Sequence, residues 1–213
     1  MIIMINNRHH WIAIILVTLF GSILFYVGTD GFQAFTEETA RTNKLVEEKP
    51  VFPDVHLEDS KERKYSFSEF EGKYVMLTFI YTSCTDVCPQ LEMNLAEVYN
   101  QVPDKYIGKD IVFLSISFDP TRDDPETLHK YQYYFDSDGE TWRMARINDQ
   151  EELDHLLDEF GVIVIPDENG NFAHNSAFYL VNPGGILIDV MDYKATNEAA
   201  DKVVRILDKE AGE

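Results

Sequence analysis

The most distinct pattern along the chain is an apolar run close to its start. Residues 11–27 read WIAIILVTLFGSILFYV and carry no charge, whereas Arg8 precedes them and Asp30 and Glu37 follow. This run is at the short end of what spans a bilayer as a helix, and a cleaved signal peptide is the alternative. We expect an uncleaved transmembrane anchor, because the exit sequence at residues 28–31 offers no convincing small-x-small cleavage site.

Charge beside the anchor predicts its orientation. Arg8 favours a cytoplasmic N-terminus, so we expect residues 1–10 to be a short cytoplasmic segment and residues 11–27 to cross the cell membrane once. The rest of the chain then lies on the extracytoplasmic side. Residues 28–49, rich in Thr, Glu and Lys, predict a polar tether. One domain, residues 50–213, follows and is long enough for an adequate core.

Strand-like and helix-like runs alternate within this domain. Residues 75–81 and 111–118 are rich in β-branched and aromatic side chains and predict buried strands. Asp124 with Pro125 predicts a capped helix start. The further expected elements are a helix with a capping box at Asn148 and Glu151 and a stop at Gly161, a hairpin of residues 176–181 and 185–190, and a last helix with an apolar stripe at Ala200, Val203, Val204 and Leu207.

The two cysteines of the chain, Cys84 and Cys88, lie between the strand predicted at 75–81 and a helix-like run. At such a junction the free N–H groups and the helix dipole stabilise a thiolate, which is the form that binds soft metals or attacks disulfides. Thiols at the end of an early strand, in a central mixed sheet flanked by helices, describe a thioredoxin-like α/β fold. The sequence therefore predicts this fold and thiol chemistry at this junction.

The four-residue spacing of the cysteines favours a metal over a structural bridge. A loop this short would stabilise the fold by only about 2 kcal/mol, and residues one helical turn apart have Cβ atoms about 5–6 Å apart, wider than a disulfide needs. Two thiolates suit Cu(I), and an added imidazole makes a set that also holds Cu(II). Zinc prefers four protein ligands, and the chain has no second cysteine pair. Redox exchange by the two thiols stays open as the alternative.

The chain is strongly acidic. With 18 basic and 38 acidic residues, its formal net charge is −20. This charge argues against nucleic-acid binding and against docking on anionic lipid, since both partners are negative. Membrane association is therefore expected to depend on the N-terminal anchor alone.

Three separated motifs resemble the Sco/SenC family. In chain order they are FIYTSCTDVCP at residues 79–89, SFDPTRD at 117–123, and HNS at 174–176 before a Tyr-Leu-Val strand. Members of this family are membrane-anchored, thioredoxin-fold copper proteins that help to assemble the binuclear copper centre of cytochrome c oxidase subunit II. The resemblance covers roughly residues 50–208.

This resemblance implies a site, a cofactor and partners. Cys84, Cys88 and His174 would be the copper ligands, for Cu(I) or Cu(II), and Asp119 with Asp123 would match the family's aspartate motif near the site. The implied partner is cytochrome c oxidase subunit II, with an upstream copper donor or a thiol reductant as a further one. We expect a metallochaperone rather than a turnover enzyme, one that delivers copper to subunit II or prepares its thiols. The alternatives are an extracytoplasmic thiol-disulfide reductase that uses Cys84 and Cys88 without delivering metal and, more weakly supported, a peroxiredoxin-like peroxide reductase.

Some positions depart from the family pattern. Thr85 stands where many members have proline, Ala173 precedes the histidine where aspartate is common, and residues 163–164 are Ile-Val in place of a tyrosine pair. These positions bear on partner choice and site tuning rather than on the ligands. For Asp119 and Asp123 a turn between two prolines is an equal interpretation.

The other histidines and the methionines are expected to be structural. His129 and His155 fall in helix-like runs, and His56 falls in a strand-like run. Apolar surroundings predict core packing for the remaining soft-ligand candidates, Met76, Met93, Met144 and Met191.

Overall fold

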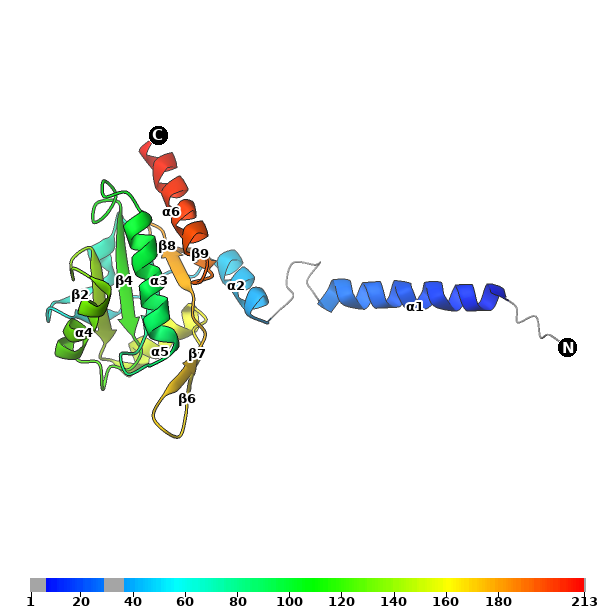
Figure 1. The fold of residues 1–213 in the computed structure, drawn as a ribbon, viewed down its shortest axis with the longest axis horizontal. Coiled ribbons are helices and arrows are strands. Elements are labelled where there is room, and N and C mark those ends of the chain that lie inside the picture. Colours follow the sequence, from blue (N-terminus) through cyan, green and yellow to red (C-terminus); the bar gives the residue numbers. More distant parts are fainter. Residues whose placement is uncertain (1–6, 29–36, 213) are drawn as a thin grey trace. The chain divides into compact units, whose positions relative to one another are not determined.

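The computed structural model describes residues 7–28 and 37–212, in a chain that divides into two compact units, Met1–Lys44 and Leu45–Glu213 (Figure 1). Helix α1 (Asn7–Gly28) contains the stretch His10–Gly28, whose mean hydropathy is 2.3. Among the described residues, this is the one helix that is long and apolar enough to cross a membrane. The predicted apolar helix is thus confirmed, whereas most of the predicted segment 1–10 lies outside the described residues.

The segment predicted as a tether, residues 28–49, contains a helix. Residues 29–36 lie outside the described residues, and α2 (Glu37–Glu48) follows them. Its sequence supports a helix, because Arg41 donates to Glu38 one turn earlier, with Nε to Oε2 at 2.9 Å. Leu45, at the start of the second unit, is buried. The composition of the segment did not reveal this amphipathic helix.

A seven-stranded mixed sheet forms the centre of the second unit, in the order β2-β1-β5-β4-β3-β8-β9. The central strands β3, β4 and β5 are parallel, and the outer strands pair antiparallel. The strands are β1 (His56–Asp59), β2 (Lys64–Ser66), β3 (Tyr74–Ile80), β4 (Ile111–Ser117), β5 (Trp142–Ile147), β8 (Phe178–Val181) and β9 (Leu187–Met191). The strands β3 and β4 are buried along their whole length, as expected for strands covered on both faces.

Four helices pack around this sheet. They are α3 (Val87–Gln101), α4 (Pro125–Gln132), α5 (Gln150–Glu159) and α6 (Thr196–Ala211), with 3-10 turns at Phe67–Phe70 and Tyr133–Phe135. Since parallel crossovers are right-handed, α3 and α4 cover the same face of the sheet, and α3 packs against α6. The predicted central mixed sheet with flanking helices is confirmed.

Helix ends test the local sequence predictions. Asp124 caps α4, its side chain accepting the N–H of Thr127 at 2.8 Å, as predicted. The predicted capping box at Asn148 is wrong: Asp149 caps α5, and the Asn148 amide instead donates to Glu58 at 2.8 Å. Gly161 ends α5 with φ of 60°, as predicted, because glycine adopts this left-handed conformation without strain.

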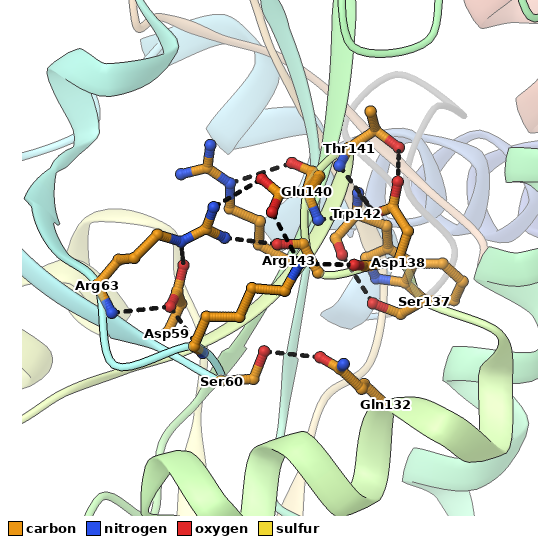
Figure 2. Close-up of polar contacts among 12 residues, drawn as sticks. Asp59, Ser60, Arg63, Gln132, Ser137, Asp138, Glu140, Thr141, Trp142 and Arg143 are labelled. Carbon is orange, nitrogen blue, oxygen red and sulfur yellow. Dashed lines mark hydrogen bonds and ion pairs between the residues drawn. The ribbon is translucent and has the colours of Figure 1, made fainter.

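A polar cluster fixes the turn between β1 and β2 against the loop before β5 (Figure 2). Arg63 donates to Asp59 at 2.7 Å and to Glu140 at 2.6 Å. Asp138 accepts the backbone N–H groups of Glu140 and Thr141, each at 2.8 Å. Arg63 pairs with two carboxylates and backbone N–H groups satisfy Asp138, so the cluster holds the two segments together.

A small hairpin stands apart from the main sheet. Strands β6 (Val164–Pro166) and β7 (Phe172–His174) form a separate two-stranded sheet, with Val164 paired to His174. Figure 1 shows this hairpin extending beyond the edge of the domain. The sequence analysis predicted no strand at these positions, because strands of three residues carry too little alternation to be recognised.

Candidate metal centre

Both thiols lie at the predicted strand-to-helix junction. Strand β3 ends at Ile80, and Cys84 lies in the following loop with 8 % of its surface exposed. Cys88 is the second residue of α3 and is fully buried. The thiols are free, and the Cys88 backbone N–H donates to Cys84 Sγ at 3.3 Å. The start of the helix therefore provides hydrogen bonding to the first sulfur, as the sequence predicted.

The two thiols have pKa values shifted in opposite directions. Burial acts to raise the pKa of Cys84, but the N–H groups of Cys88 and Asp86, with the Cys88 and Tyr81 side chains, outweigh it and hold this pKa below its ordinary value. Burial raises the pKa of Cys88 strongly; the N–H of Tyr81 acts the other way, and negative charge on Cys84 adds to the rise. Cys84 is thus the thiol that ionises first.

His174 lies beside the buried thiol. Its Nε2 is 3.4 Å from Cys88 Sγ, and its Nδ1 is 3.1 Å from the backbone carbonyl oxygen of Asn175. Burial lowers the pKa of His174, against the opposing effect of the Asn175 carbonyl, so the ring is neutral. With Nδ1–H donating to Asn175, Nε2 carries a lone pair toward Cys88. The protonated Cys88 thiol can therefore donate a hydrogen bond to Nε2 of the neutral imidazole.

The donor set fits copper by its chemistry. Two sulfurs and one imidazole nitrogen suit Cu(I) and also allow Cu(II). Across residues 7–28 and 37–212, no three His, Cys, Asp or Glu side chains already stand together as a formed metal cluster. The structure places His174 against Cys88 and Cys88 against Cys84, without drawing the three side chains into one metal-binding group.

The two predicted aspartates make structural hydrogen bonds, and only Asp123 binds the loop that carries Cys84. Asp123 is fully buried and accepts the Thr82 N–H at 2.9 Å, the Thr82 hydroxyl at 2.5 Å and the Ser117 hydroxyl at 2.5 Å. Burial raises its pKa, while these hydrogen bonds oppose the rise. Asp119 pairs with Arg122 and accepts the Thr121 hydroxyl at 3.1 Å. The turn interpretation describes Asp119, and Asp123 holds the loop two residues before Cys84.

Aromatic side chains that the sequence analysis did not single out enclose His174. Its ring centroid is 5.0 Å from that of Phe118 and 6.2 Å from that of Tyr81. Phe172 packs edge-on against both of these aromatic rings. Tyr81 and Phe118 each follow a buried strand directly, and that position was the available signal. These rings cover part of the half-buried imidazole, and this burial lowers the pKa of His174.

A buried carboxylate was also missed. Glu92 is fully buried on α3, one helical turn after Cys88, and accepts hydroxyl hydrogen bonds from Thr78 and Ser115, each at 2.7 Å. The signal was an acidic residue on the same helical stripe as Cys88 and Leu95.

The remaining soft-ligand candidates lie elsewhere. His155 is exposed on α5, and His129 contacts Tyr133, with Nε2 at 3.1 Å from its hydroxyl. Met76, Met144 and Met191 are buried, as predicted, but the prediction for Met93 is wrong, since 53 % of its surface is exposed. Met93 follows Glu92 on α3 and lies on the exposed face of that helix.

Comparison with known proteins identifies relatives of this arrangement. The chain is 27 % identical over 125 residues to a SCO1 protein homolog of Bacillus subtilis, an alignment that covers 58 % of this chain and 64 % of that protein. The chain thus spans less than two thirds of the length of that relative. A Stutzerimonas stutzeri protein described as copper-binding is 26 % identical over 147 residues, covering 67 % of this chain and 70 % of that protein.

Solved structures share the fold. A structure of BsSco, described as a member of the Sco family of cytochrome c oxidase assembly proteins with a disulfide switch, matches with a TM-score of 0.63 at 22 % identity, covering 73 % of this chain and 92 % of that one. The predicted thioredoxin-like fold is thereby confirmed. The family model SCO1/SenC matches residues 44–208, which is nearly the whole of the second unit. The chain belongs to the SCO1/SenC family.

Proposed function

We propose that this chain is a membrane-anchored copper metallochaperone that binds one copper ion through Cys84, Cys88 and His174. It delivers this copper to the binuclear copper site of cytochrome c oxidase subunit II, or prepares the thiols of that site. The observation that carries the proposal is the imidazole Nε2 at 3.4 Å from the sulfur of a free, buried thiol pair. A relative described as copper-binding and the assembly role described for BsSco support it.

The residues divide the chemistry of copper loading. Cys84, with its lowered pKa, offers the first thiolate, and metal binding then displaces the proton held between Cys88 and His174. The neutral imidazole needs no deprotonation to act as a ligand. Copper leaves by ligand exchange, in which acceptor thiols replace these ligands one at a time.

Helix α1 provides the anchor in this proposal. Residues 1–10 lie in the cytoplasm, residues 11–27 cross the cell membrane once, and the segment 28–49 connects them to the domain at 50–213 on the extracytoplasmic side. The apolar helix His10–Gly28 and Arg8 before it support this topology.

A second candidate function is thiol-disulfide reduction. The opposite pKa shifts of Cys84 and Cys88 favour it, because one thiol is poised to attack and the other to stay protonated until it resolves a mixed disulfide. This chemistry keeps the cysteines of the acceptor reduced and requires no histidine. Removing His174 therefore separates the two functions.

The test is copper titration of the full-length chain in detergent, with each oxidation state supplied separately. Cys88→Ser should abolish tight binding, and His174→Ala should weaken Cu(II) binding more than Cu(I) binding, since Cu(I) is satisfied by two sulfurs. His155→Ala, at an exposed histidine on α5, is the matched control. Unchanged stoichiometry and affinity in Cys88→Ser would rule out the proposed ligands.

A further inference from the structure

The candidate ligand His174 lies on a strand that the main sheet does not hold. Within residues 7–28 and 37–212, strands β6 and β7 pair only with each other, so no backbone ladder there fixes β7 relative to the cysteine loop. At its base the hairpin is held by Asn175, whose side chain accepts the Ile163 N–H at 2.6 Å and donates to the Gly161 carbonyl at 3.1 Å. Contacts beyond this base must position the imidazole.

Besides the contact of His174 with Cys88, a pair of hydrogen bonds joins β7 to the cysteine side of the site. The Tyr81 hydroxyl donates to the Phe172 carbonyl at 3.2 Å and accepts the Phe172 N–H at 3.3 Å. Phe172 pairs across the hairpin with Pro166, next to the hydrogen-bonded pair of Asp167 and Asn171, so the N–H and C=O of Phe172 face out of the hairpin toward the tyrosine. The hydroxyl thus completes the hydrogen bonding of the strand two residues before His174.

Tyr81 is well placed to transmit this constraint. It directly follows β3, three residues before Cys84, and only 3 % of its surface is exposed. The ring contacts of Phe172 with Tyr81, at 5.1 Å between centroids, and with the Arg122 guanidinium, at 5.4 Å, tolerate sliding. The two hydrogen bonds of the Tyr81 hydroxyl do not tolerate sliding, because both can form only when Phe172 lies at one position relative to this hydroxyl.

We infer that Tyr81 is a positioning residue whose hydroxyl holds the β7 strand so that the His174 imidazole stays over the Cys84–Cys88 pair. This inference rests on the proposed function for its copper arm only. Tyr81→Phe keeps the ring and its aromatic contacts but removes both hydrogen bonds to Phe172. It also removes the contact of the hydroxyl with Cys84, whose sulfur keeps the N–H groups of Cys88 and Asp86. Strand β7 can then shift relative to the thiols. Cys84, Cys88 and His174 are therefore in position to bind one metal ion for a smaller fraction of the time.

Two measurements on the full-length chain in detergent test this. In hydrogen exchange of the metal-free chain, amides of residues 164–174 should exchange faster in Tyr81→Phe, while those of β8 keep their protection. Cu(II) affinity should fall roughly tenfold, the effect of losing about two hydrogen bonds, and Cu(I) affinity should stay within about twofold. The Cu(II) electron paramagnetic resonance spectrum should also change. Tyr99→Phe is the matched control, since it removes a partly buried hydroxyl that bonds Thr141 at 2.8 Å instead.

Each possible result either supports or overturns the positioning role of Tyr81. Faster hairpin exchange together with selective loss of Cu(II) affinity supports the positioning role. Unchanged hairpin exchange in Tyr81→Phe overturns it, and so does an unchanged Cu(II) affinity and spectrum in a chain whose wild type binds copper. A wild-type chain that binds no copper refutes the proposed function, and the exchange measurement then decides alone whether Tyr81 holds β7.

Discussion

The buried carboxylate of Glu92 makes the stability of the domain depend on pH. It is fully buried, and burial raises its pKa to about 7, against the opposing effect of hydrogen bonds from Ser115 and Thr78. The Trp142 indole N–H donates to Ser115 Oγ at 3.0 Å and so extends the network to β5. Glu92→Gln keeps the shape and the hydrogen bonding, because the amide accepts from one hydroxyl and donates to the other, but it cannot ionise.

The size and sign follow from linkage. Raising the pKa from its ordinary value of 4.5 to about 7 corresponds to about 3 kcal/mol between the two protonation states. Because the folded-state pKa is the higher one, this contribution is fully present below pH 4.5 and is lost as pH rises through 7. We expect the wild type to lose about 2–3 kcal/mol of unfolding free energy from Glu92 between pH 5 and pH 8. Glu92→Gln should lack this loss and be the more stable form at pH 8.

The assay is urea unfolding of the full-length chain in detergent at pH 5, 6, 7 and 8. A Trp11→Phe background leaves Trp142, within the network, as the fluorescent reporter. Glu97→Gln, an exposed position on the same helix, is the control for removing one negative charge from a chain of net charge −20. If Glu92→Gln and Glu97→Gln have parallel pH profiles, the carboxylate at 92 does not carry the raised pKa.

Oxidation of the thiol pair should exclude copper, because bonded sulfurs cannot serve as two thiolate ligands, and Cu(I) loading should protect both thiols from alkylation; full-strength Cu(I) binding by the oxidised chain would contradict this. Protease added to intact spheroplasts should digest the domain after residue 45, and protection until lysis would reverse the proposed orientation. Asp123→Ala should cost about 2–4 kcal/mol in thermal unfolding, because it leaves the Thr82 and Ser117 donors unpaired. Asp158→Ala, an exposed control, should cost little. Equal melting temperatures for Asp123→Ala and Asp158→Ala would refute the role of Asp123 in holding the cysteine loop.

Local signals in the sequence predicted the elements that position the thiols. The β-branched run before Cys84, the helical stripe after Cys88 and the Asp124 cap each depend on neighbouring residues, and the structure has all three. The strand carrying His174 was missed because its pairing with β6 is three residues long and gives no periodic signal. At α5, two adjacent polar residues were both capable of capping, and only the tertiary contact of Asn148 with Glu58 decided between them.

Roles that depend on distant partners were beyond the sequence. Asp123 falls in a motif that also fits a turn, and its partly buried bonds to Thr82 arise because the ends of β3 and β4 are adjacent. Tyr81 reads as the last residue of a strand, and its partner lies 91 positions away. From its charge alone, Glu92 would be expected at an exposed position. It is nevertheless buried and accepts hydrogen bonds from the hydroxyls of Thr78 on β3 and Ser115 on β4.

The proposed ligands belong to two differently supported parts of the domain. Cys84 and Cys88 lie on a loop and helix start that Asp123 ties to β4, through a buried bond to Ser117 and partly buried bonds to Thr82. His174 lies on a hairpin that is joined to this loop through the Tyr81 hydroxyl. Since Cu(I) is satisfied by two thiolates whereas Cu(II) gains more from the imidazole, loosening the loop should weaken both states and loosening the hairpin should weaken mainly Cu(II). Movement of the hairpin would then give an acceptor access to Cu(I) while both sulfurs still hold it.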